Sequence, residues 1–450
     1  MTSPDRLIDQ LAKTIGQTAQ IDPALFNRYG VKRGLRNDDG SGVLVGLTKV
    51  GDVVGYERDE AGALVPVPGR LFYRGYDVAE LVRGALADDR PGFEEVAYLL
   101  LSGVLPDKAD LEAFRSLLVE RMPLPHEAVM SILALRGSNI MNILARSVLE
   151  LYTYDPDPED LSPEHAMEQS ISLIARFPAI IAYAYNVHRH HTQGLPLHVR
   201  LPKEELSLAQ NFLYMLRKDY TPLDARILDL LLVLQAEHGG GNNSAFAVRV
   251  VSSTLTDTYS AIAAGIGSLK GPLHGGANIE VTDMFEHLKG AIHDWTDAGE
   301  IRAYLTRMLN KDAYDRSGLI YGVGHAVYTI SDPRFLLLRD QARALAVEKD
   351  RLAEFEFLDL IGQQAIDLVS QVKKQGGPAA LNVDFYSGFL YEIIGIPPEL
   401  FTAIFAMARI VGWVAHRNEE LNFSGRRIIR PAYMNVIENE PAAYVPLNRR

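Results

Sequence analysis

The sequence contains no cysteine among its 450 residues. Disulfide bonds, thiolate nucleophiles and zinc sites with cysteine ligands are therefore excluded. A dense positive charge is missing as well, because 45 Lys and Arg residues stand against 57 Asp and Glu residues and give a net charge of −12. Nucleic-acid binding needs a concentrated cationic surface, so we expect no nucleic-acid partner. The chemistry of the chain must come from His, Asp, Glu, Arg or a bound cofactor.

Long uninterrupted apolar runs are also scarce, since charged residues or glycines break them before they reach the length of a membrane span. We therefore expect no transmembrane helix and no membrane partner. The N-terminal stretch "MTSPDRLIDQLAKTIGQ" lacks the apolar core of a signal peptide, which predicts a cytoplasmic protein. With 47% hydrophobic and 23% charged residues, the composition is globular, and the length suits a large domain with a smaller companion.

Most of the chain has the hydrophobic period of amphipathic helices. Apolar residues recur at steps of three and four in residues 171–185, 223–236 and 352–372. The small residues of "DTYSAIAAGIGSLKG", residues 257–271, predict a central helix in close contact with its neighbours. A strand-like alternation is found mainly between residues 43 and 73, in "GVLVG", "VVGYE" and "LFYRGY". We predict a mainly α fold with a small β-hairpin region near the N-terminus.

A histidine stands where neither a helix nor a strand continues easily. In "GPLHGGAN", His274 lies between Pro272 and the pair Gly275–Gly276, so we expect it at a junction between two helices. A histidine near a helix N-terminus is biased toward its neutral form, which can donate a hydrogen bond without carrying charge. A histidine that merely caps backbone groups at a turn has the same pattern.

Two further histidines follow or precede glycines. In "GVGHAVY", Gly322 and Gly324 come before His325, which suits the close approach of a ligand but also a simple tight turn. In "EHGGGNNSAF", His238 precedes three glycines and two asparagines. A helix C-cap explains those glycines, but it does not explain why histidine and asparagine gather beside them.

Three charged residues are candidates for binding or proton transfer. Arg334 stands at a helix start in "DPR", where a cation opposes the helix dipole, so either an anion is bound there or the side chain is at the surface. Asp384 in "LNVDFYSG" is either a helix N-cap or a base whose pKa is raised by apolar surroundings. Arg409 shares a helix face with Phe405 and Trp413, so it is either buried with an anion or reaches out to solvent.

Three other clusters give no indication of a metal site or a nucleic-acid site. His188, His190 and His191 lack a carboxylate at ligand-like spacing, which favours a solvated helix end over a metal site. The acidic segment "YDPDPEDLSP", residues 154–163, lacks the glycine and terminal glutamate of a calcium loop. The arginines of "GRRIIRP", residues 425–431, have no interleaved aromatic residues and are poor evidence for nucleic-acid binding. We predict no metal site.

Six motifs, in this order, closely resemble blocks of the citrate synthase family: "EHGGGNNSAF", "GPLHGGAN", "GVGHAVYTISDPR", "NVDFYSG", "MARIVGWVAH" and "IIRPAY". They cover roughly the C-terminal half of the chain, and "LFYRGYDVAEL" resembles an earlier segment of the same family. Several blocks in one order are far more specific than any single motif.

The resemblance implies a two-domain helical fold. Residues 1–276 and 390–450 would form a large domain, and residues 277–389 a small domain that carries part of the active site. Domain closure would bury the substrates between the two. Members of the family are homodimers in which each site is completed by the partner subunit. The implied activity is that of a transferase of the tricarboxylic acid cycle, which condenses acetyl-CoA with oxaloacetate and water to give citrate and CoA.

The resemblance also implies the roles of the site residues. Asp384 would remove a proton from the methyl group of acetyl-CoA, His274 would donate a hydrogen bond to the thioester oxygen of the forming enol, and His325 would protonate the ketone oxygen of oxaloacetate. Hydrolysis of citryl-CoA would then release the products. The implied oxaloacetate contacts are His238, Arg334, Arg409 and, from the neighbouring subunit, Arg430.

The implied contacts to CoA follow the family less closely. The backbone of Gly322, Val323 and Gly324 matches the segment that meets the adenine. Many relatives carry Arg or Lys shortly before the "DPR" arginine to meet a CoA phosphate, whereas this chain has Thr329 there and Ala326 directly after the histidine. Arg33 in "VKRGLR" is a candidate for a phosphate contact.

Other functions remain open at this point. A 2-methylcitrate synthase that uses propanoyl-CoA has the same catalytic set, and one methylene changes selectivity by only about 1 to 3 kcal/mol. A non-catalytic protein that binds acyl-CoA or a dicarboxylate is disfavoured by the presence of all three catalytic residues. We expect no permanently bound cofactor, with acetyl-CoA as co-substrate. The preferred acyl-CoA, allosteric regulation and assembly beyond a dimer are not predicted by the sequence.

Overall fold

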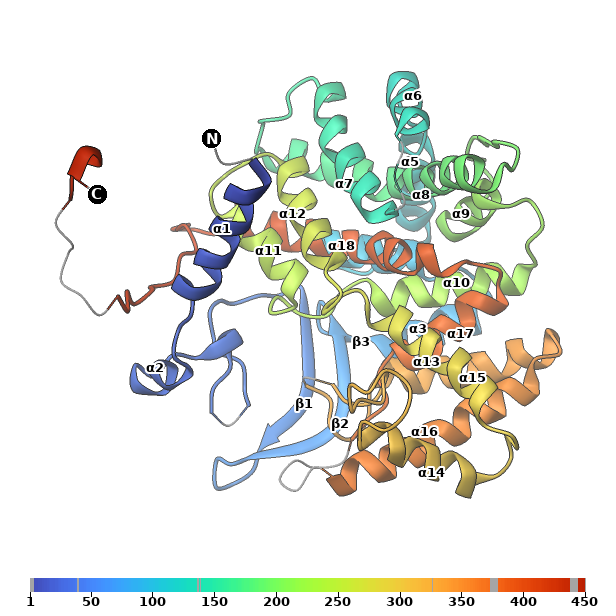
Figure 1. Ribbon diagram of the computed structural model, residues 1–450. Coiled ribbons are helices and arrows are strands. Elements are labelled where there is room, and N and C mark those ends of the chain that lie inside the picture. Colours follow the sequence, from blue (N-terminus) through green and yellow to red (C-terminus); the bar gives the residue numbers. More distant parts are fainter. Residues whose placement is uncertain are drawn as a thin grey trace. The chain divides into compact units, whose positions relative to one another are not determined.

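The computed structural model describes residues 4–38, 40–135, 137, 139–325, 327–372, 379–437 and 444–449. Within these residues the chain forms 18 α-helices and one three-stranded sheet, which confirms the prediction of a mainly α fold (Figure 1). The chain divides into two compact units. Unit 1 comprises Met1–Gly46 with Ile429–Arg450, and unit 2 comprises Leu47–Ile428.

Unit 1 has no buried residue among those described. Its elements are α1 (Pro4–Thr18), α2 (Pro23–Arg28), η1 (Arg33–Leu35) and η4 (Leu447–Arg449). The prediction of a strand in "GVLVG" was wrong, because only a single bridge between Arg36 and Gly42 forms there. Without a continuous partner strand to supply ladder hydrogen bonds, the alternating side chains stay in water, and Leu44 is 85% exposed.

Unit 2 contains the sheet and the remaining helices. In chain order its elements are β1 (Gly51–Arg58), β2 (Leu64–Tyr73), β3 (Tyr76–Asp77), α3 (Val78–Ala87), α4 (Phe93–Ser102), α5 (Lys108–Arg121), α6 (His126–Ala134), α7 (Ile140–Leu151), η2 (Tyr152–Tyr154), α8 (Pro163–Gln193), α9 (Leu208–Leu216), α10 (Pro222–Gln235), α11 (Asn243–Ser252), α12 (Thr258–Lys270), α13 (Ala277–Ala291), α14 (Ala298–Leu309), α15 (Pro333–Glu348), α16 (Leu352–Val372), α17 (Asp384–Ile393), η3 (Pro398–Leu400) and α18 (Phe401–Leu421).

The predicted helical segments are confirmed. Residues 171–185 lie within α8, residues 223–236 correspond to α10, and residues 352–372 coincide with α16. The start of α10 carries a capping box in which Thr221 and Asp224 satisfy each other's backbone N–H groups. The acidic segment before α8 is a loop, as predicted, and its Asp155 accepts hydrogen bonds from Gln169 and Tyr259.

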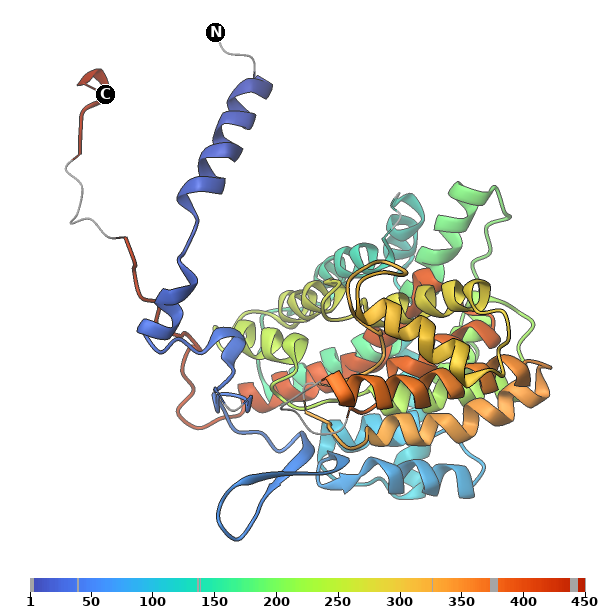
Figure 2. The ribbon, with the colours of Figure 1, turned by 60° about the horizontal axis from the view of Figure 1, so that its bottom comes forward.

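The sheet is a hairpin with a short third strand. β1 and β2 pair antiparallel from Gly51 opposite Tyr73 to Arg58 opposite Leu64, and Figure 2 shows them as a long ribbon at the edge of unit 2. β3 pairs with the end of β2. The strands predicted in "VVGYE" and "LFYRGY" are therefore confirmed.

Two glycines of the hairpin let the loop after His325 approach closely. A Cβ atom at Gly69 would overlap the carbonyl oxygen of Ser331, and one at Gly55 would stand 2.5 Å from the carbonyl oxygen of Val327. The N–H group of Gly69 donates a hydrogen bond of 3.1 Å to the same carbonyl of Ser331. The hairpin thus holds this loop by backbone contacts that a side chain would prevent.

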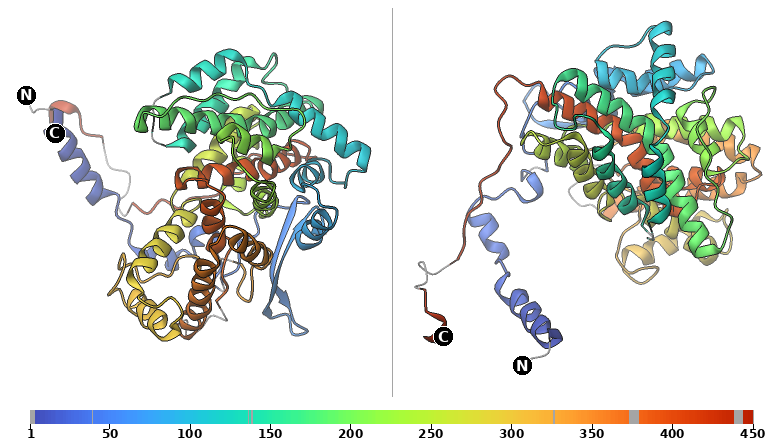
Figure 3. Two further views of the ribbon diagram at one scale, coloured as in Figure 1. Left: turned by 90° about the vertical axis from the view of Figure 1, so that its right-hand side faces the viewer. Right: turned by 90° about the horizontal axis from the view of Figure 1, so that it is seen from above.

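The core of unit 2 is built around α18, which contacts α4, α7, α8, α10, α11 and α12 (Figures 1 and 3). The prediction of a close-packed helix at residues 257–271 is confirmed, since an added Cβ at Gly265 of α12 would lie 2.7 Å from Val248. In the part of the chain that the structure describes, two helices, Pro163–Gln193 and Pro398–Leu421, are long and apolar enough to cross a membrane. They are mostly buried within the protein, as the core helices of globular proteins are.

Helices α13 to α17 form a group on one side of unit 2, seen in yellow to brown in the left view of Figure 3. Contacts between α13 and α17, α14 and α16, and α15 and α17 hold the group together. The division into a large domain and a small domain at residues 277–389 remains a prediction.

Candidate active site

The turn that carries His238 is fixed by contacts from two other elements. Tyr73 at the end of β2 donates a hydrogen bond of 2.9 Å from its hydroxyl to the carbonyl of Val233. From α18, the N–H group of Gly412 donates to the carbonyl of Ala236 at 3.2 Å. The backbone groups just before the histidine are thus paired at the place where α10 ends.

The His238 ring is kept neutral. Its pKa lies well below 6.5 because of burial and the positive charges of Arg334 and Arg409, with His325 acting in the same direction. The ring centroid lies 5.2 Å from that of His325, in an edge-on contact. The Nε2 atom of His238 is buried and has no hydrogen-bond partner. A buried polar atom of this kind suits a ligand.

His274 lies in the turn between α12 and α13, which confirms the predicted helix junction. Its backbone N–H donates to the carbonyl of Gly271 at 2.9 Å. The N–H group of Ser244 donates to its Nε2 atom at 3.3 Å, so that the proton of the neutral ring lies on Nδ1. Burial and the charge of Arg409 lower the pKa of His274 to about 4. The ring is therefore neutral at pH 7 and can donate a hydrogen bond from Nδ1, while its Nε2 atom caps the backbone N–H group of Ser244.

His325 is oriented by its own loop. Its Nδ1 atom accepts hydrogen bonds of 3.0 Å from the N–H groups of Val327 and Tyr328. The proton of the neutral ring therefore lies on Nε2. The ring also stacks on the ring of Tyr328 with centroids 4.6 Å apart. These contacts fix both the tautomer and the plane of the histidine.

The loop before His325 is paired with the loop before Asp384. Residues 322–324 run beside residues 380–382, with a β-bridge at their centre. The N–H group of Gly324 donates to the carbonyl of Ala380 at 2.7 Å, and the amide of Asn382 donates to the carbonyl of Gly324 at 3.1 Å. The pairing brings together two segments that are far apart in the sequence.

Asp384 is the first residue of α17, and the cap position is held by Val383, which makes no side-chain capping bond. The alternative of an N-cap role for Asp384 was therefore wrong. Burial raises the pKa of Asp384 to about 6, against the opposing effect of the positive charges of Arg334 and Arg409. A carboxyl group with this pKa is ionised at neutral pH and is a stronger base than an ordinary aspartate.

Arg334 is 4% exposed, so the surface alternative was wrong. Asp332, the N-cap of α15, accepts hydrogen bonds from the Nε atom of Arg334 at 3.0 Å and from Nη2 at 2.7 Å. Burial acts to lower the pKa of Arg334, but the charge and hydrogen bonds of Asp332 raise it above its ordinary value. The guanidinium is held in one orientation by a bidentate pair.

Arg409 is 1% exposed, so the alternative of a side chain that reaches solvent was also wrong. Its Nε atom donates to the carbonyl of Gln235 at 2.8 Å, and its guanidinium carbon lies 4.7 Å from the ring centroid of Phe405. Burial lowers the pKa of Arg409 to about 10, against the effect of the charge of Glu237. The Nη1 atom is buried without a hydrogen-bond partner. A charged, incompletely paired guanidinium suits an anion.

Six of the predicted residues are thus linked by charge, ring or backbone contacts within unit 2. The set provides two neutral histidines that can donate, a third histidine with a fixed tautomer, two buried cations and one carboxylate with a raised pKa. Its members are His238, His274, His325, Arg334, Asp384 and Arg409. This arrangement can bind a small polycarboxylate and remove a proton next to a carbonyl group.

The structure places two predicted residues outside this group, in unit 1. Arg33 is exposed at the start of η1, with its guanidinium carbon 4.7 Å from the ring centroid of Phe26. Arg430 is also exposed. Their contacts to CoA and oxaloacetate remain predictions.

The remaining predicted contacts to CoA lie in the loop that contains His325. Gly322 and Gly324 have the positive φ angles of 79° and 99° that favour glycine. The hydroxyl oxygen of Thr329 is buried without a hydrogen-bond partner. Ala326 lies outside the described residues. The binding of adenine at this backbone remains a prediction.

Sequence reasoning missed the residues that support the site. Asp332, Ser244 and Tyr328 all lie in the motifs quoted above. Asp332 and Tyr328 act on other residues through their side chains and Ser244 through its backbone N–H group, so none of them gives a pattern of its own. The sequence "DPR" could have indicated this pair, because Asp332 and Arg334 carry opposite charges two residues apart at a helix start and can bind each other there.

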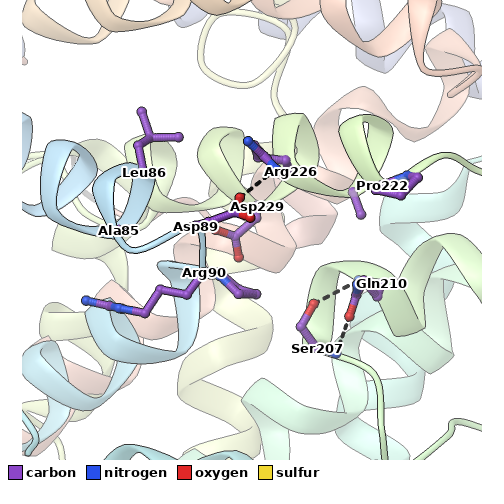
Figure 4. A pocket seen from close by; sticks show the side chains of 11 residues that line it. Ala85, Leu86, Asp89, Arg90, Ser207, Gln210, Pro222, Arg226 and Asp229 are labelled. Atoms are coloured by element: carbon purple, nitrogen blue, oxygen red, sulfur yellow. Dashed lines mark hydrogen bonds and ion pairs between the residues drawn. The ribbon is translucent and has the colours of Figure 1, made fainter. Parts of the chain in front are cut away.

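A cavity of about 160 Å³ lies away from these residues, between α3, α9 and α10. Figure 4 shows Asp229 and Arg226 of α10 in its wall, with Ser207 and Gln210 on the facing element. No member of the candidate site lines it. Among the described residues, no group of three His, Asp or Glu side chains is arranged to hold a metal ion.

Comparison with known families decides the assignment. The sequence model for "Citrate synthase, C-terminal domain" matches residues 39–432. The chain belongs to the citrate synthase family. The citrate synthase of Synechocystis is 34% identical over 387 residues, which are 85% of this chain and 88% of that protein. A 2-methylcitrate synthase of Shewanella oneidensis is 33% identical, over 84% of this chain and 92% of that protein.

Solved citrate synthase structures have the same fold. The enzyme of Pyrobaculum aerophilum matches with a TM-score of 0.75 at 33% identity, over 91% of this chain and 94% of that chain. A Thermoplasma acidophilum citrate synthase, solved as a ternary complex with carboxymethyl coenzyme A and oxaloacetate, has a TM-score of 0.75 at 25% identity, over 93% of this chain and 99% of that chain.

Proposed function

We propose that this member of the citrate synthase family condenses acetyl-CoA with oxaloacetate and water to give citrate and CoA. The observation that carries the proposal is the pairing of residues 322–324 with residues 380–382, which brings the loop of His325 beside the loop of Asp384. Condensation needs a base for the acyl-CoA and an acid for the ketone, both fixed in one site.

In the first step, Asp384 removes a proton from the methyl group of acetyl-CoA. The electron pair of that C–H bond moves into the thioester, and its oxygen acquires negative charge. His274 donates a hydrogen bond to this oxygen from Nδ1, because Ser244 occupies Nε2. A neutral donor that is already in place lowers the barrier without reorganisation. The raised pKa of Asp384, about 6, supports its role as the base.

In the second step, the enol carbon attacks the ketone carbon of oxaloacetate, and the ketone oxygen takes a proton from Nε2 of His325. Loss of this proton leaves His325 as an imidazolate, whose negative charge is stabilised by the N–H groups of Val327 and Tyr328 at its Nδ1 atom. The proton that Asp384 accepted balances the one that His325 lost, and its return restores both side chains. Water then hydrolyses the thioester of citryl-CoA. Arg334 and Arg409 bind the carboxylates of oxaloacetate, and His238 contacts the same substrate, which agrees with its unpaired Nε2.

The alternative substrate is propanoyl-CoA, which would make the protein a 2-methylcitrate synthase. One experiment separates the two. Release of free thiol is measured from acetyl-CoA and from propanoyl-CoA, each with oxaloacetate, on one purified sample. We expect the higher kcat/KM with acetyl-CoA. Comparable or faster turnover of propanoyl-CoA would move the assignment to methylcitrate chemistry, and no thiol release from either would refute the enzymatic function.

We further propose that the active form is a homodimer and that Arg430 completes the site of the partner subunit. The support is the exposure of unit 1, in which the aliphatic residues of α1 stay in contact with water. Leu7, Ile8, Leu11 and Ile15 are 49% to 62% exposed, and Ile437 is 77% exposed. An apolar surface of this extent is normally covered in an assembly. We propose the cytoplasm as the location and the tricarboxylic acid cycle as the pathway.

A further inference from the structure

Arg409 and Glu237 are buried beside the same turn and attract each other, but they are not bonded. Both side chains are at most 1% exposed. Arg409 donates from Nε to the carbonyl of Gln235, two residues before Glu237. Its Nη1 atom and the Oε2 atom of Glu237 are both buried without a partner. No ion pair joins the two side chains in the described part of the chain.

The Glu237 carboxylate is bound on its other side by His416 of α18. The Oε1 atom of Glu237 lies 2.9 Å from Nε2 of His416, and neither side chain is exposed. Burial would raise the pKa of Glu237, but His416 and the charge of Arg409 bring it below its ordinary value. Glu237 is therefore an ionised carboxylate that is held by a histidine.

His416 is itself held in position. Nη1 of Arg249 lies 3.4 Å from Nδ1 of His416 and donates to its carbonyl at 3.2 Å. The same guanidinium is fixed by Glu419 through hydrogen bonds of 3.0 Å and 2.8 Å. The histidine thus bridges a cation on one side and the Glu237 carboxylate on the other.

The fold provides a slot for this carboxylate. A Cβ atom at Gly51 of β1 would stand 2.8 Å from Cγ of Glu237, and a Cβ at Gly412 of α18 would overlap its Oε2 atom. The two glycines leave room for Glu237 beside His416. The direction of the side chain is therefore set by packing as well as by the hydrogen bond.

We propose that His416 is a positioning residue that holds the Glu237 carboxylate away from Arg409, so that the guanidinium remains available to a carboxylate of oxaloacetate. This inference rests on the proposed oxaloacetate site. Opposite charges attract strongly inside a protein, so an ionised carboxylate that is not held elsewhere binds the nearest guanidinium. Oxaloacetate would then have to displace an internal competitor. His416 acts through Glu237 and does not touch the substrate.

A matched pair of substitutions tests the proposal. His416→Asn keeps a polar group near the Nδ1 position, on the side of Arg249, but does not reach Glu237, whereas His416→Gln places an amide donor near the Nε2 position. We expect His416→Asn to raise the KM for oxaloacetate about tenfold and to change kcat at saturating oxaloacetate less than about threefold. With His416→Gln, KM should stay within about threefold of the wild-type value.

The double variant Glu237→Gln/His416→Asn shows whether His416 acts by holding the Glu237 carboxylate away from Arg409 or only by supporting the fold. Without the carboxylate there is no competitor, so KM should return to within about threefold of the wild-type value. A KM that stays raised in the double variant, or an unchanged KM in His416→Asn, overturns the proposal. Absence of thiol release by the wild-type enzyme would instead refute the proposed function.

A second measurement covers the case in which His416→Asn does not fold. Glu237→Gln alone removes the negative charge of the Glu237 carboxylate and leaves His416 in place. The proposal predicts a KM for oxaloacetate equal to or below that of the wild type. An increase of about tenfold in this variant, with circular dichroism unchanged, would show that the Glu237 carboxylate supports oxaloacetate binding and does not compete with it, and would overturn the proposal.

Discussion

Asp332 binds Arg334 through three hydrogen bonds, one from the backbone N–H at 2.9 Å and two from the guanidinium at 3.0 Å and 2.7 Å. Asp332→Asn removes the charge and one acceptor of this pair. We expect the KM for oxaloacetate to rise about tenfold and the free energy of unfolding to fall by about 3 kcal/mol, because a buried guanidinium loses its counter-charge. Initial rates and urea unfolding measure the two effects. Asp38→Asn, at a carboxylate that is 95% exposed, is the control and should change neither.

Asp384 sets the acid side of the pH profile. Because the base must be ionised and its pKa is about 6, kcat/KM should rise with pH through about 6 and level off above it. Asp384→Asn should lower kcat about 100- to 10,000-fold while the circular dichroism spectrum is kept. A kcat/KM that does not change between pH 5 and pH 7, a range of about one unit on either side of this pKa, would contradict the assignment of Asp384 as the base.

Asp229 makes the stability of the fold depend on pH between about 4 and 7. Burial and the neighbouring charge of Glu94 raise its pKa from 3.8 to about 7. The folded state therefore binds more protons than the unfolded state, and stability present below pH 4 is lost as the pH rises through about 7.

We accordingly expect Asp229→Asn to raise the melting temperature at pH 8 more than at pH 5, with a gain of up to about 4 kcal/mol at the higher pH. The amide keeps one acceptor for the N–H groups of Gly92 and Phe93, which the carboxylate binds at 2.7 Å and 3.2 Å. The cavity in Figure 4 gives the new side chain room to adjust. Equal melting shifts at both pH values would refute this account.

Gly69 allows the loop that orients His325 to pack closely against the hairpin. Gly69→Ala places a methyl group onto the carbonyl of Ser331 and 2.5 Å from the ring of Tyr328. We expect kcat to fall about 10- to 100-fold, because His325 is displaced from the ketone oxygen. Gly84→Ala in α3 meets nothing within 4 Å and is the control. It should leave kcat unchanged and stabilise the helix by about 1 kcal/mol.

Complementation tests the shared site. Asp384→Asn and Arg430→Ala should each be nearly inactive alone. If Arg430 acts in the partner's site, a heterodimer of the two variants has one intact site, and random exchange in an equal mixture restores about a quarter of the wild-type activity. Subunits are mixed, exchanged in mild denaturant and refolded, with thiol release as readout. No recovery, with mixed dimers confirmed by mass spectrometry, would place Arg430 in its own subunit's site.

The sequence predicted the elements and residues whose signals are local. The period of α16 and the small residues of α12 follow from side chains close together in the chain. The strand expected at "GVLVG" failed because a strand needs a partner, which a local alternation does not supply. The alternatives for Arg334 and Asp384 could be decided only by burial and capping, which the tertiary structure determines.

The pair of Glu237 and His416 lay beyond sequence reasoning altogether. The two residues are 179 positions apart, and each lies in a motif that was quoted for another residue. Their contact depends on β1 and α18 both contributing a glycine at the same place. The sequence of either segment alone does not predict the contact between Glu237 and His416.

The backbone pairing of residues 322–324 with residues 380–382 has a consequence for how the reaction tolerates motion. The proposed proton donor, His325, and the proposed base, Asp384, follow the two segments that this pairing joins, whereas His274 and Arg409 belong to the α12–α13 turn and to α18. A movement of the paired segments relative to the α12–α13 turn and α18 would change the contacts to the substrates. It would leave the distance between His325 and Asp384 unaltered. In the proposed reaction, proton transfer would thus depend on one pair of backbone segments and substrate binding on others.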